Sequence, residues 1–582
     1  MVGWQIGIMD ALGLGISLRS AGSGILLNTC AQQNVRKFDH NSARGTTFRG
    51  QGLTPRKRIG YSETKRPSST KRVFASAGSE TQSVESNASK SEGNGHGSNQ
   101  AVLEKPNAPE EQQAEEGSKF NWATAWYPIA VINDLDKNGP TAATIIGRPL
   151  ALWWDRSTDK WQVYADQCPH RLAPLSEGSI SAEGHLRCSY HGWTFKGDSG
   201  ECTGIPQAPK EGKPLHESKK ACVTVYPSME HQGILWFWPD LSQGSINVEA
   251  AANPPPHIPE FGDPAFGFDL SSRDLEYGYE TLIENLMDPA HVNFAHHKIQ
   301  GNRKNATDLK FQITSKITPA GFSGKDENSE AIFNPPCCFR LAFTIGGKKP
   351  VGVSDVTSGR KWSLTGSSKE KAPKKVSLIF ICIPVSPGRS RLIWSFPRNF
   401  FTTGFKIIPP WVTHMTNNLV LDSDLLLLHL LGKRLEYEGE SNWFERCYTP
   451  AGADAYVIGF RKWLNDFAGG APDWAGRFEN KIPPSPPKEI ILDRYYTHVV
   501  RCKSCSSACK NFKALEVTLQ VLAIALVGLV AASAVLPIPA VTKLAVPMVI
   551  GAVLSTILSR WLANFIYKTF YFHDYNHAVV TD

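Results

Sequence analysis

Two long hydrophobic runs close the chain. VTLQVLAIALVGLVAASAVL covers residues 517–536 without a charge, and a second apolar run extends from about residue 544 to 562. Each is long enough to cross a hydrocarbon core of about 30 Å as a helix. The short connection PIPAVTK predicts a transmembrane helical hairpin over 514–566, followed by a tail over 567–582. The lysines that flank it (Lys510, Lys513 and Lys568) favour both ends lying on the side of the soluble domains. The alternative is a hairpin buried in a protein core.

Shorter patterns precede the hairpin. LIFICIPV (378–385) and RLIWSFP (391–397) belong to a stretch, 305–400, in which apolar and polar positions alternate. This alternation predicts an antiparallel sheet that forms the wall of an apolar pocket. NNLVLDSDLLLLHL (417–430) predicts a helix, and the segments 161–167 and 194–205 predict strands of a small β domain.

The first 120 residues show no pattern of a packed core. Residues 1–75 hold twelve Lys and Arg and three acidic residues, and they end near VFASA. An Arg- and Ser-rich, acid-poor leader is typical of an organellar transit peptide, which we expect over 1–77. A disordered basic tail is the alternative. Residues 78–120 are polar, with almost no aromatic residues, and predict a disordered linker.

Composition excludes two classes of protein. The net charge of +8 is concentrated in the leader, and basic blocks with interleaved aromatic residues are missing from the sequence, so we expect no nucleic-acid partner. Twelve cysteines in 582 residues are too few for a disulfide scaffold, which favours an intracellular compartment.

Two short motifs pair a cysteine with a histidine. Cys168 and His170 are followed, after seventeen residues, by Cys188 and His191. Zinc sites usually group Cys with Cys and His with His, whereas one thiolate and one imidazole in each loop suit a cluster of two inequivalent irons. The spacing predicts a Rieske [2Fe–2S] centre in a β domain over 121–245.

A second metal motif follows at ENLMDPAHVNFAHH (284–297). His291 and His296 can converge on one ion if the helix bends or ends between them. With a carboxylate they would form the 2-His-1-carboxylate set of non-haem Fe(II), which activates O₂. Asp424 is preferred over Asp422 for that carboxylate because it directly begins the apolar run of its predicted helix. Asp288, three residues before His291 and on the same helical face, is free for another role. His297 is expected outside the metal set, near the substrate pocket.

The segment CKSCSSAC (502–509) lies just before the hairpin. A metal site is disfavoured there because only His498 stands nearby as a further donor. Cys502 and Cys505 have the CxxC spacing that can close into a disulfide, and neighbouring cations favour thiolates. Cys509 leaves the pairing open between 502–505 and 505–509. The expectation is a redox segment over 491–513.

With these motifs in place, the chain from about residue 122 onward resembles a family. CPHRLAPLSEG, the DPxH-x4-H site, the CxxC and the membrane hairpin are similar to the chloroplast Rieske non-haem iron oxygenases of the pheophorbide a oxygenase group. SLIFICIPVSPGRSRLIWSFPRNF (377–400), DRYYTHVVRCKSC (493–505) and FIYKTFYFHDYNHAVV (565–580) resemble members associated with protein import. FAHHKIQGNR (294–303) is more similar to members that open the chlorophyll macrocycle.

The resemblance implies an α+β fold: an all-β Rieske domain, an α+β catalytic domain over 246–490 with an antiparallel sheet and helices that carry a mononuclear iron, and the hairpin. It implies a monooxygenase that uses O₂, reduced ferredoxin and a chlorophyll-type tetrapyrrole similar to protochlorophyllide. It also implies a homotrimer, in which Asp288 bridges a cluster histidine of a neighbouring subunit to His291, and a thioredoxin-addressed switch at Cys502 and Cys505.

The resemblance also implies a location. We expect a chloroplast membrane, the inner envelope ahead of the thylakoid, with the soluble domains facing the stroma. Two alternatives remain: an oxygenase that opens the macrocycle in chlorophyll breakdown, and a redox-sensing subunit of an import translocon with little catalysis. The sequence shows no nucleotide-binding G-x-G-x-x-G and no flavin or plant-type ferredoxin pattern, which agrees with an external electron source.

Overall fold

The computed structural model describes residues 119–577 and 580, apart from 245–246, 346–372, 440–442, 479–480 and 537–538. The expected transit peptide and nearly all of the expected linker lie outside the described residues.

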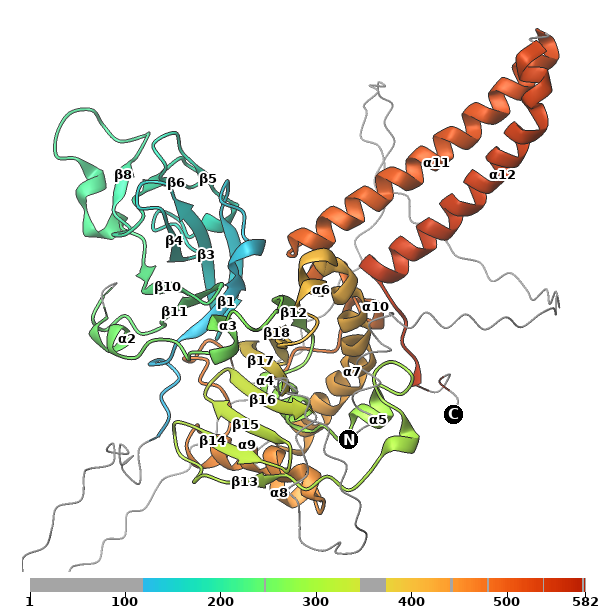
Figure 1. Ribbon diagram of the computed structural model, residues 1–582. Helices are drawn as coiled ribbons and strands as arrows, with labels where there is room; N and C mark the ends of the chain where they lie inside the picture. The colour runs from blue at the N-terminus through green and yellow to red at the C-terminus, as the bar shows by residue number, and fades with distance from the viewer. Residues whose placement is uncertain are drawn as a thin grey trace, which may run out of the picture. The chain divides into compact units, whose positions relative to one another are not determined.

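Residues 127–237 form three small antiparallel sheets (Figure 1). The first has the order β2 (Thr141–Ile145), β3 (Arg148–Asp155), β4 (Lys160–Ala165) and β9 (Val225–Tyr226). The second has the order β5 (Ser179–Ile180), β6 (Leu186–Arg187), β7 (Thr194–Phe195) and β8 (Cys202–Gly204). The third has the order β1 (Tyr127–Val131), β11 (Ile234–Phe237) and β10 (Ser228–His231). The expectation of an all-β domain around the Cys/His motifs is confirmed.

A seven-stranded antiparallel sheet follows, as the alternating pattern predicts. Its order is β12 (Ser271–Leu275), β18 (Arg389–Ser395), β17 (Lys374–Ser386), β16 (Cys338–Ile345), β15 (Ser329–Asn334), β14 (Phe322–Lys325) and β13 (Gln312–Ile313). Helices accompany it: α2 (Val248–Ala252), α3 (Pro259–Gly262), α4 (Tyr279–Met287), α5 (Val292–Ala295), α6 (Thr402–Ile407), α7 (Pro410–Glu438), α8 (Trp443–Arg446), α9 (Ala455–Asp466) and α10 (Lys488–Ile491). The catalytic part is therefore α+β.

Helix α7 is the longest helix outside the hairpin. Pro410 stands at its first position, where the missing N–H costs nothing, and Gly439 ends it with a positive φ of 88°. Most of its buried positions form one broad face, with His414 near the middle and Asp422 and Asp424 at opposite edges. A buried face of this width can present polar groups to different parts of the fold.

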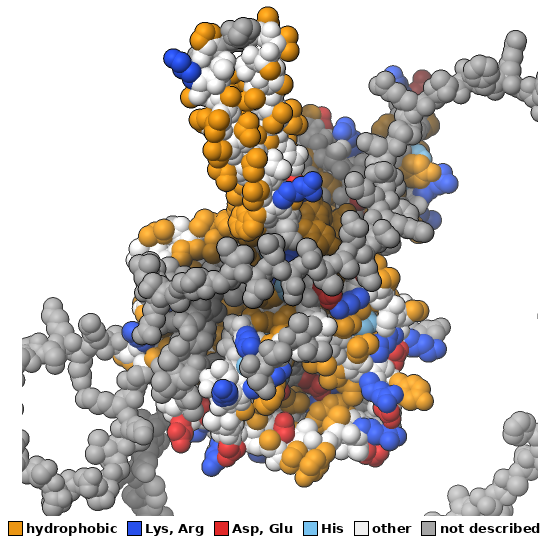
Figure 2. All heavy atoms as spheres, turned by 90° about the vertical axis from the view of Figure 1, so that its right-hand side faces the viewer, with side chains coloured by type: hydrophobic (Ala, Val, Ile, Leu, Met, Phe, Trp, Pro, Cys, Tyr) orange, Lys and Arg blue, Asp and Glu red, His pale blue; other side chains and the backbone are white. Residues whose placement is uncertain are grey.

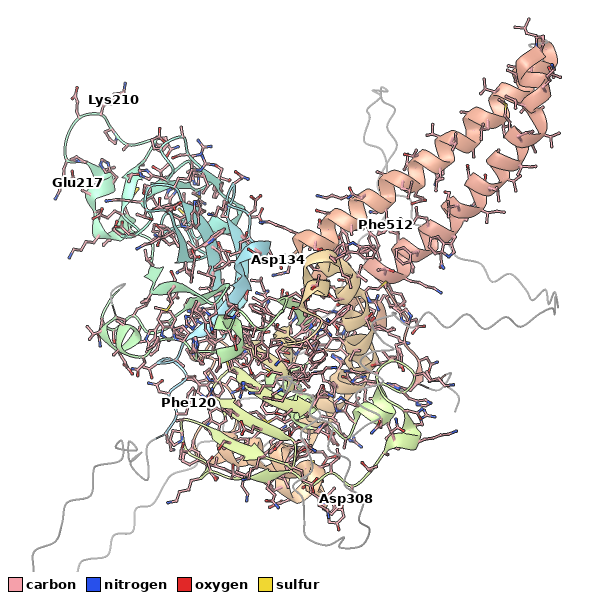
Figure 3. All side chains as sticks on the ribbon, viewed as in Figure 1. Phe120, Asp134, Lys210, Glu217, Asp308 and Phe512 are labelled. Carbon is pink, nitrogen blue, oxygen red and sulfur yellow. The ribbon has the colours of Figure 1, made fainter. Side chains whose placement is uncertain are left out.

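Helices α11 (Lys503–Val535) and α12 (Pro539–Ile566) form the expected hairpin, and both are long and apolar enough to cross a membrane (Figure 2). Helix α11 begins well before the expected span, so the second half of the expected redox segment, 503–513, is continuous with the first hairpin helix. Its first N–H, at Lys503, donates to Asp134 of the β domain at 2.9 Å, and Figure 3 labels Asp134 beside this helix end.

One hydrophobic core extends from Trp122 through the seven-stranded sheet to Leu492. It takes in strands of both the β domain and the catalytic part. A smaller core surrounds Cys168 and Cys188, and a third, which includes Cys502 and Cys505, lies at the base of the hairpin.

A buried charge network ties α7 to its surroundings. The carboxylate of Asp422 lies 2.7 Å from the Nη1 atom of Arg273, on β12, and accepts a hydrogen bond from Nε of Arg494 at 2.7 Å. Arg494 also donates to the backbone carbonyl of Lys568 at 2.8 Å, just after α12. All three side chains are almost fully excluded from solvent.

We therefore expect Asp422→Asn to destabilise the fold. Two guanidiniums would lose their common buried counter-charge, a change that costs about 3–5 kcal/mol in other buried pairs. The pair of the exposed Arg434 and the partly exposed Glu438 on the same helix supplies the control, because Glu438→Gln should cost less than about 1 kcal/mol. Thermal unfolding of the full chain measures both variants, and equal midpoints would contradict the structural role of Asp422.

Candidate active site and cluster site

The two Cys/His motifs occupy matched loops. In each loop the cysteine N–H donates to the carbonyl five residues later at 2.8 Å. The residue four positions after each cysteine, Leu172 or Gly192, has a positive φ of 60° or 77°. Cys168 and Cys188 are buried, and burial together with the neighbouring Cys188 thiol raises the pKa of Cys168 to about 11. Local turn geometry thus brings the two thiols together beneath the surface.

The two imidazoles lie on the outer side of these loops. The Nδ1 atoms of His170 and His191 are 3.1 Å apart, and the ring of His170 stacks on Trp193 with the centroids 4.7 Å apart. His170 is exposed and His191 half-buried. Two buried sulfurs and two facing imidazoles fit the donors of a [2Fe–2S] cluster with one histidine-bound iron. Imidazoles at the surface leave a path for electrons to enter or leave.

His291 and His296 flank the single turn of α5. Pro289 follows the end of α4, and His291 and His296 are the residues immediately before and after α5. Their Nε2 atoms lie 3.1 Å apart. The sequence predicts a bend or helix end between the two histidines, whereas the break lies before them, at Asp288 and Pro289, and one helical turn separates them. The histidines converge because they stand at opposite ends of that turn.

Asp424 joins these histidines and Asp422 does not. The Oδ2 atom of Asp424 lies 3.4 Å from Nε2 of His296 and 3.9 Å from Nε2 of His291. The three ligand atoms form one of the two groups of potential metal donors within 4.8 Å of one another in the part of the chain that the structure describes. Asp422 is instead engaged by Arg273 and Arg494.

Hydrogen bonds fix the orientation of both rings. Nδ1 of His291 contacts the backbone carbonyl of Asp288, and Nδ1 of His296 lies 2.6 Å from the hydroxyl oxygen of Ser423. Ser423 donates its own proton to the carbonyl of Val420 at 2.6 Å, so its oxygen accepts from His296. Each Nδ1 thus carries the proton, and both Nε2 lone pairs point toward Asp424.

The Nε2 atoms of the two histidines and the carboxylate of Asp424 therefore face one another as acceptors, with no proton between them. Burial lowers the pKa of His296 to about 3, so this imidazole stays neutral, and burial raises the pKa of Asp424 to about 6. The second oxygen of Asp424 is buried and has no hydrogen-bond partner among the residues that the structure describes. Two facing imidazole acceptors and a carboxylate fit a divalent cation such as Fe(II).

Asp288 lies beside this group, but it is not on a shared helical face. It ends α4 in an extended conformation because Pro289 disfavours helix at the preceding residue, which corrects the expectation from spacing. Its carboxylate accepts from the N–H of Ala290 at 2.8 Å and lies 3.8 Å from Nδ1 of His291. The side chain is 29% exposed, and burial raises its pKa.

An apolar pocket opens onto His291, His296 and Asp424. Strands β16, β17 and β18 form one apolar wall, as the sequence predicts for this sheet, and helix α7 lines another side. The lining includes Leu341, Val376, Leu378, Phe380, Leu392, Trp394, Phe396, Arg398 and Phe405. His297 is not among the lining residues; it is buried, and its Nδ1 accepts from the N–H of Arg303 at 3.2 Å.

Sequence reasoning did not find three residues of this site. Ser423 orients His296, Asn285 places its side-chain amide 3.4 Å from Nε2 of His291, and Arg398 lines the pocket. The sequence offers no spacing signal for any of them, because each approaches the histidines or the pocket only through the fold.

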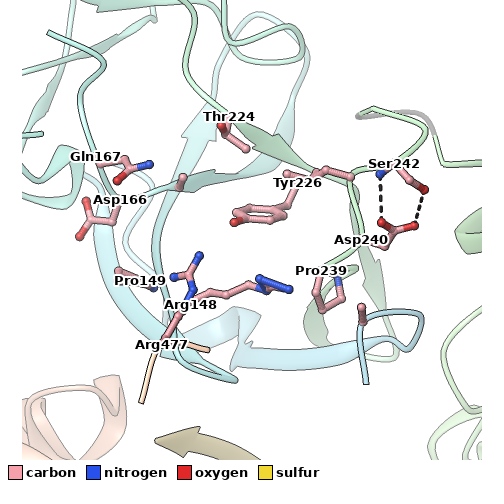
Figure 4. Close-up of a pocket in the computed structure, with 13 residues that line it drawn as sticks. Arg148, Pro149, Asp166, Gln167, Thr224, Tyr226, Pro239, Asp240, Ser242 and Arg477 are labelled. Atoms are coloured by element: carbon pink, nitrogen blue, oxygen red, sulfur yellow. Dashed lines mark hydrogen bonds between the residues drawn. The ribbon is translucent and has the colours of Figure 1, made fainter. Parts of the chain in front are cut away.

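A second pocket lies at the β domain (Figure 4). Arg148, Arg477 and Tyr226 line it, together with Asp240, which accepts from the N–H and hydroxyl of Ser242 at 3.0 and 2.6 Å. Its described lining contains none of the predicted site residues.

Cys502 and Cys505 are buried at the start of α11. The structure places them together with His414 and His498, which forms the other group of potential metal donors among the described residues. Cys509, one turn further on, is also buried but is not in this group.

Comparison with known proteins agrees with the sites. Residues 125–227 match the Rieske [2Fe-2S] domain family, and residues 333–442 match the pheophorbide a oxygenase family.

Three relatives align over most of their length. The chain is 42% identical to protochlorophyllide-dependent translocon component 52 of Arabidopsis thaliana, over 81% of this chain and 89% of the relative. It is 41% identical to flavonoid 8-hydroxylase 2 of Ocimum basilicum (82% and 89%) and 37% identical to pheophorbide a oxygenase of Arabidopsis thaliana (80% and 86%). All three are described as chloroplastic. The resemblance stated from the sequence motifs is confirmed.

The chain belongs to the chloroplast Rieske non-haem iron oxygenases of the pheophorbide a oxygenase group, enzymes that carry a Rieske [2Fe–2S] cluster and a mononuclear iron.

Proposed function

We propose that this chain is a membrane-anchored monooxygenase that oxygenates a planar, carboxylate-bearing ring system, a chlorophyll-type tetrapyrrole similar to protochlorophyllide. The observation that carries the proposal is the pocket: an apolar, aromatic wall leads to the His291, His296 and Asp424 group and contains one half-buried guanidinium. Aromatic walls suit a flat conjugated ring, and a single guanidinium suits one substrate acid.

Arg398 is that guanidinium. Its Nε atom is buried and has no hydrogen-bond partner among the described residues. The guanidinium packs over the rings of Phe405 and Phe401, with its central carbon 4.7 and 5.7 Å from the ring centroids. Burial lowers its pKa, while the negative charge of Asp269 opposes this shift. A substrate carboxylate would supply the missing hydrogen-bond partner and a second negative charge in addition to Asp269.

The residues of the site divide the work among them. His291, His296 and Asp424 would hold the mononuclear iron, and Cys168, His170, Cys188 and His191 would hold the cluster. When bound, the two centres supply O₂ activation and the electrons for it. The contacts of Ser423 and of the Asp288 carbonyl hold protons on Nδ1 of the two iron-site histidines. The apolar wall excludes water from the reacting edge of the ring.

Electron delivery needs partners. Reduced ferredoxin is the proposed donor. We propose a homotrimer in which the partly exposed Asp288 accepts a hydrogen bond from a cluster histidine of the neighbouring subunit. Asp288 would then link that histidine to His291 and provide the route for electrons. The hairpin α11–α12 would anchor the enzyme in a chloroplast membrane, most simply the inner envelope, with its soluble parts in the stroma. Association with protein-import subunits belongs to the same proposal, on the similarity to the translocon component.

The similarity to a flavonoid hydroxylase supports a second candidate substrate class. A flavonoid is also flat and aromatic, but it carries no carboxylate to meet Arg398. Opening of the chlorophyll macrocycle is compatible with the same pocket. The product mass distinguishes a ring-opened product from a simply hydroxylated one.

The full chain, loaded with iron and reduced through ferredoxin, tests the proposal with ¹⁸O₂. We expect a product that gains one ¹⁸O atom from a free-acid tetrapyrrole. Arg398→Met should raise the KM for the acid by roughly 10- to 100-fold, as expected for a lost charge-assisted hydrogen bond, with little change for the methyl ester of the same pigment. The exposed Arg434→Met on α7 serves as control.

Three outcomes would contradict this substrate class. A product from flavonoids but from no tetrapyrrole would favour the flavonoid class. An equal effect of Arg398→Met on the KM for the acid and for the ester would show that Arg398 does not bind the substrate carboxylate. No product from either class, with all irons present, would favour a redox-sensing translocon subunit.

The bridging role of Asp288 is tested by Asp288→Asn. The amide oxygen can still accept from Ala290, so the loop should keep its shape and both iron centres should stay bound. We expect the single-turnover product yield of the pre-reduced enzyme to fall at least tenfold, because the negative link between the imidazoles is lost. Asp308→Asn, at an exposed carboxylate, is the control. A normal yield in Asp288→Asn would show that electrons do not pass by this route.

A further inference from the structure

Four buried side chains meet at the base of the hairpin, outside both iron sites. They are His414 on α7, His498 in the π-helical turn η8 (Tyr495–Val499), Cys502 immediately before α11, and Cys505 in its first turn. Each is at most 3% exposed, and their ligand atoms all lie within 4.8 Å of one another. We call them the four-donor site.

The distances match those between ligands of one ion. Nδ1 of His414 lies 3.5 Å from the Sγ atoms of both Cys502 and Cys505, and Nε2 of His498 lies 3.3 Å from Sγ of Cys505. In a tetrahedral zinc site with Zn–S of about 2.3 Å and Zn–N of about 2.0–2.1 Å, neighbouring N and S atoms are about 3.6 Å apart. A two-iron cluster would need a wider separation of the sulfur and nitrogen pairs.

Outer contacts orient both imidazoles toward the centre. Nδ1 of His498 donates to the backbone carbonyl of Ser272 on β12 at 2.6 Å, which leaves the lone pair of Nε2 facing Cys505. The opposite nitrogen of His414, Nε2, lies 3.7 Å from a carboxylate oxygen of Asp269, and its other nitrogen faces the sulfurs. A histidine that binds a metal through one nitrogen typically directs the other to a carboxylate or carbonyl.

Two hydrogen bonds can satisfy the thiols, from Cys502 to Nδ1 of His414 and from Cys505 to Nε2 of His498. They do not account for Nδ1 of His414 lying equally close, at 3.5 Å, to the sulfur of Cys505. A Cys502–Cys505 disulfide would leave two imidazole nitrogens facing sulfurs that carry no proton. One divalent cation uses all four donors, and two thiolates neutralise its charge in a buried place. The N-terminus of α11 also favours thiolates at these positions.

We propose that His414, His498, Cys502 and Cys505 bind a structural Zn²⁺ ion. The set has four protein ligands and no open position, which is the pattern of a structural rather than a catalytic zinc site. The ion fastens α11 to α7, the helix that also carries Asp424, and to the turn that follows α10. The metal therefore joins the membrane hairpin to the oxygenase.

This assignment revises the interpretation of CKSCSSAC. The missing donor, His414, lies 88 positions before Cys502 in the sequence and is brought to the motif only by the fold. Sulfurs bound to zinc are not free to form a disulfide, so the thioredoxin-addressed switch predicted from the sequence is not the resting state of the pair.

The metal content of the full chain, purified under reducing conditions with Zn²⁺ in the growth medium, tests the proposal. We expect one zinc per chain in addition to iron, and X-ray absorption at the zinc edge should show two sulfurs at about 2.3 Å and two nitrogens at about 2.0–2.1 Å. A protein without zinc that contains a Cys502–Cys505 disulfide, or free thiols, would overturn the proposal.

Variants separate binding from folding. His498→Ala and Cys505→Ser should lose the zinc and keep the electron paramagnetic resonance signal of the Rieske cluster, which reports an intact β domain. Cys447→Ser, at a half-buried cysteine outside the site, should keep the zinc. His414→Cys should also keep it, with three sulfurs in the absorption spectrum. Full zinc in His498→Ala and Cys505→Ser, or an unchanged sulfur count in His414→Cys, would contradict the assignment. None of these readouts depends on turnover, so they are independent of the proposed substrate.

Discussion

The carboxylate of Asp422, buried between two arginines, holds together the parts of the fold on which both metal sites depend. Arg273 brings the sheet edge at β12 to this charge, and Arg494 brings the chain that follows α10 and the end of α12. Charges buried this deeply are stable only when they are paired and hydrogen-bonded. The position of α7 is therefore fixed against the sheet, the hairpin base and the turn before α11 at one point.

Helix α7 distributes its polar residues around this anchor. Asp422 and Asp424 are two positions apart, which is about 200° around a helix, so one faces the arginines while the other faces His291 and His296. His414, about two turns earlier, lies between these two directions, about 80° around the helix from each, and faces the start of α11. One rigid helix thus carries a donor for the proposed iron and a donor for the proposed zinc. A shift of the hairpin relative to the oxygenase would therefore change the geometry of both proposed metal sites.

Much of this could be read from the sequence because the signals are local. Cys168 with His170 and Cys188 with His191 lie within single loops. The alternation of apolar and polar residues in β17 and β18 predicts the pocket wall. The preference for Asp424 over Asp422 rested on the apolar run, whereas the structure gives a different reason: Asp422 is engaged by Arg273 and Arg494. The helical-face placement of Asp288 was wrong because Pro289 ends the helix. Arg398 and His414 could not be found, since the iron-site pocket that Arg398 lines and the cysteines that His414 faces are brought to them only by the fold.

The central claim is that His291, His296 and Asp424 hold the mononuclear iron. Counting the iron bound per chain tests it most directly, with the resonance signal of the Rieske cluster recorded on the same samples. The full chain should contain three irons, and Asp424→Ala should contain two, with the cluster signal unchanged. A third iron retained in Asp424→Ala would contradict the account, because the carboxylate ligand would then have to come from elsewhere.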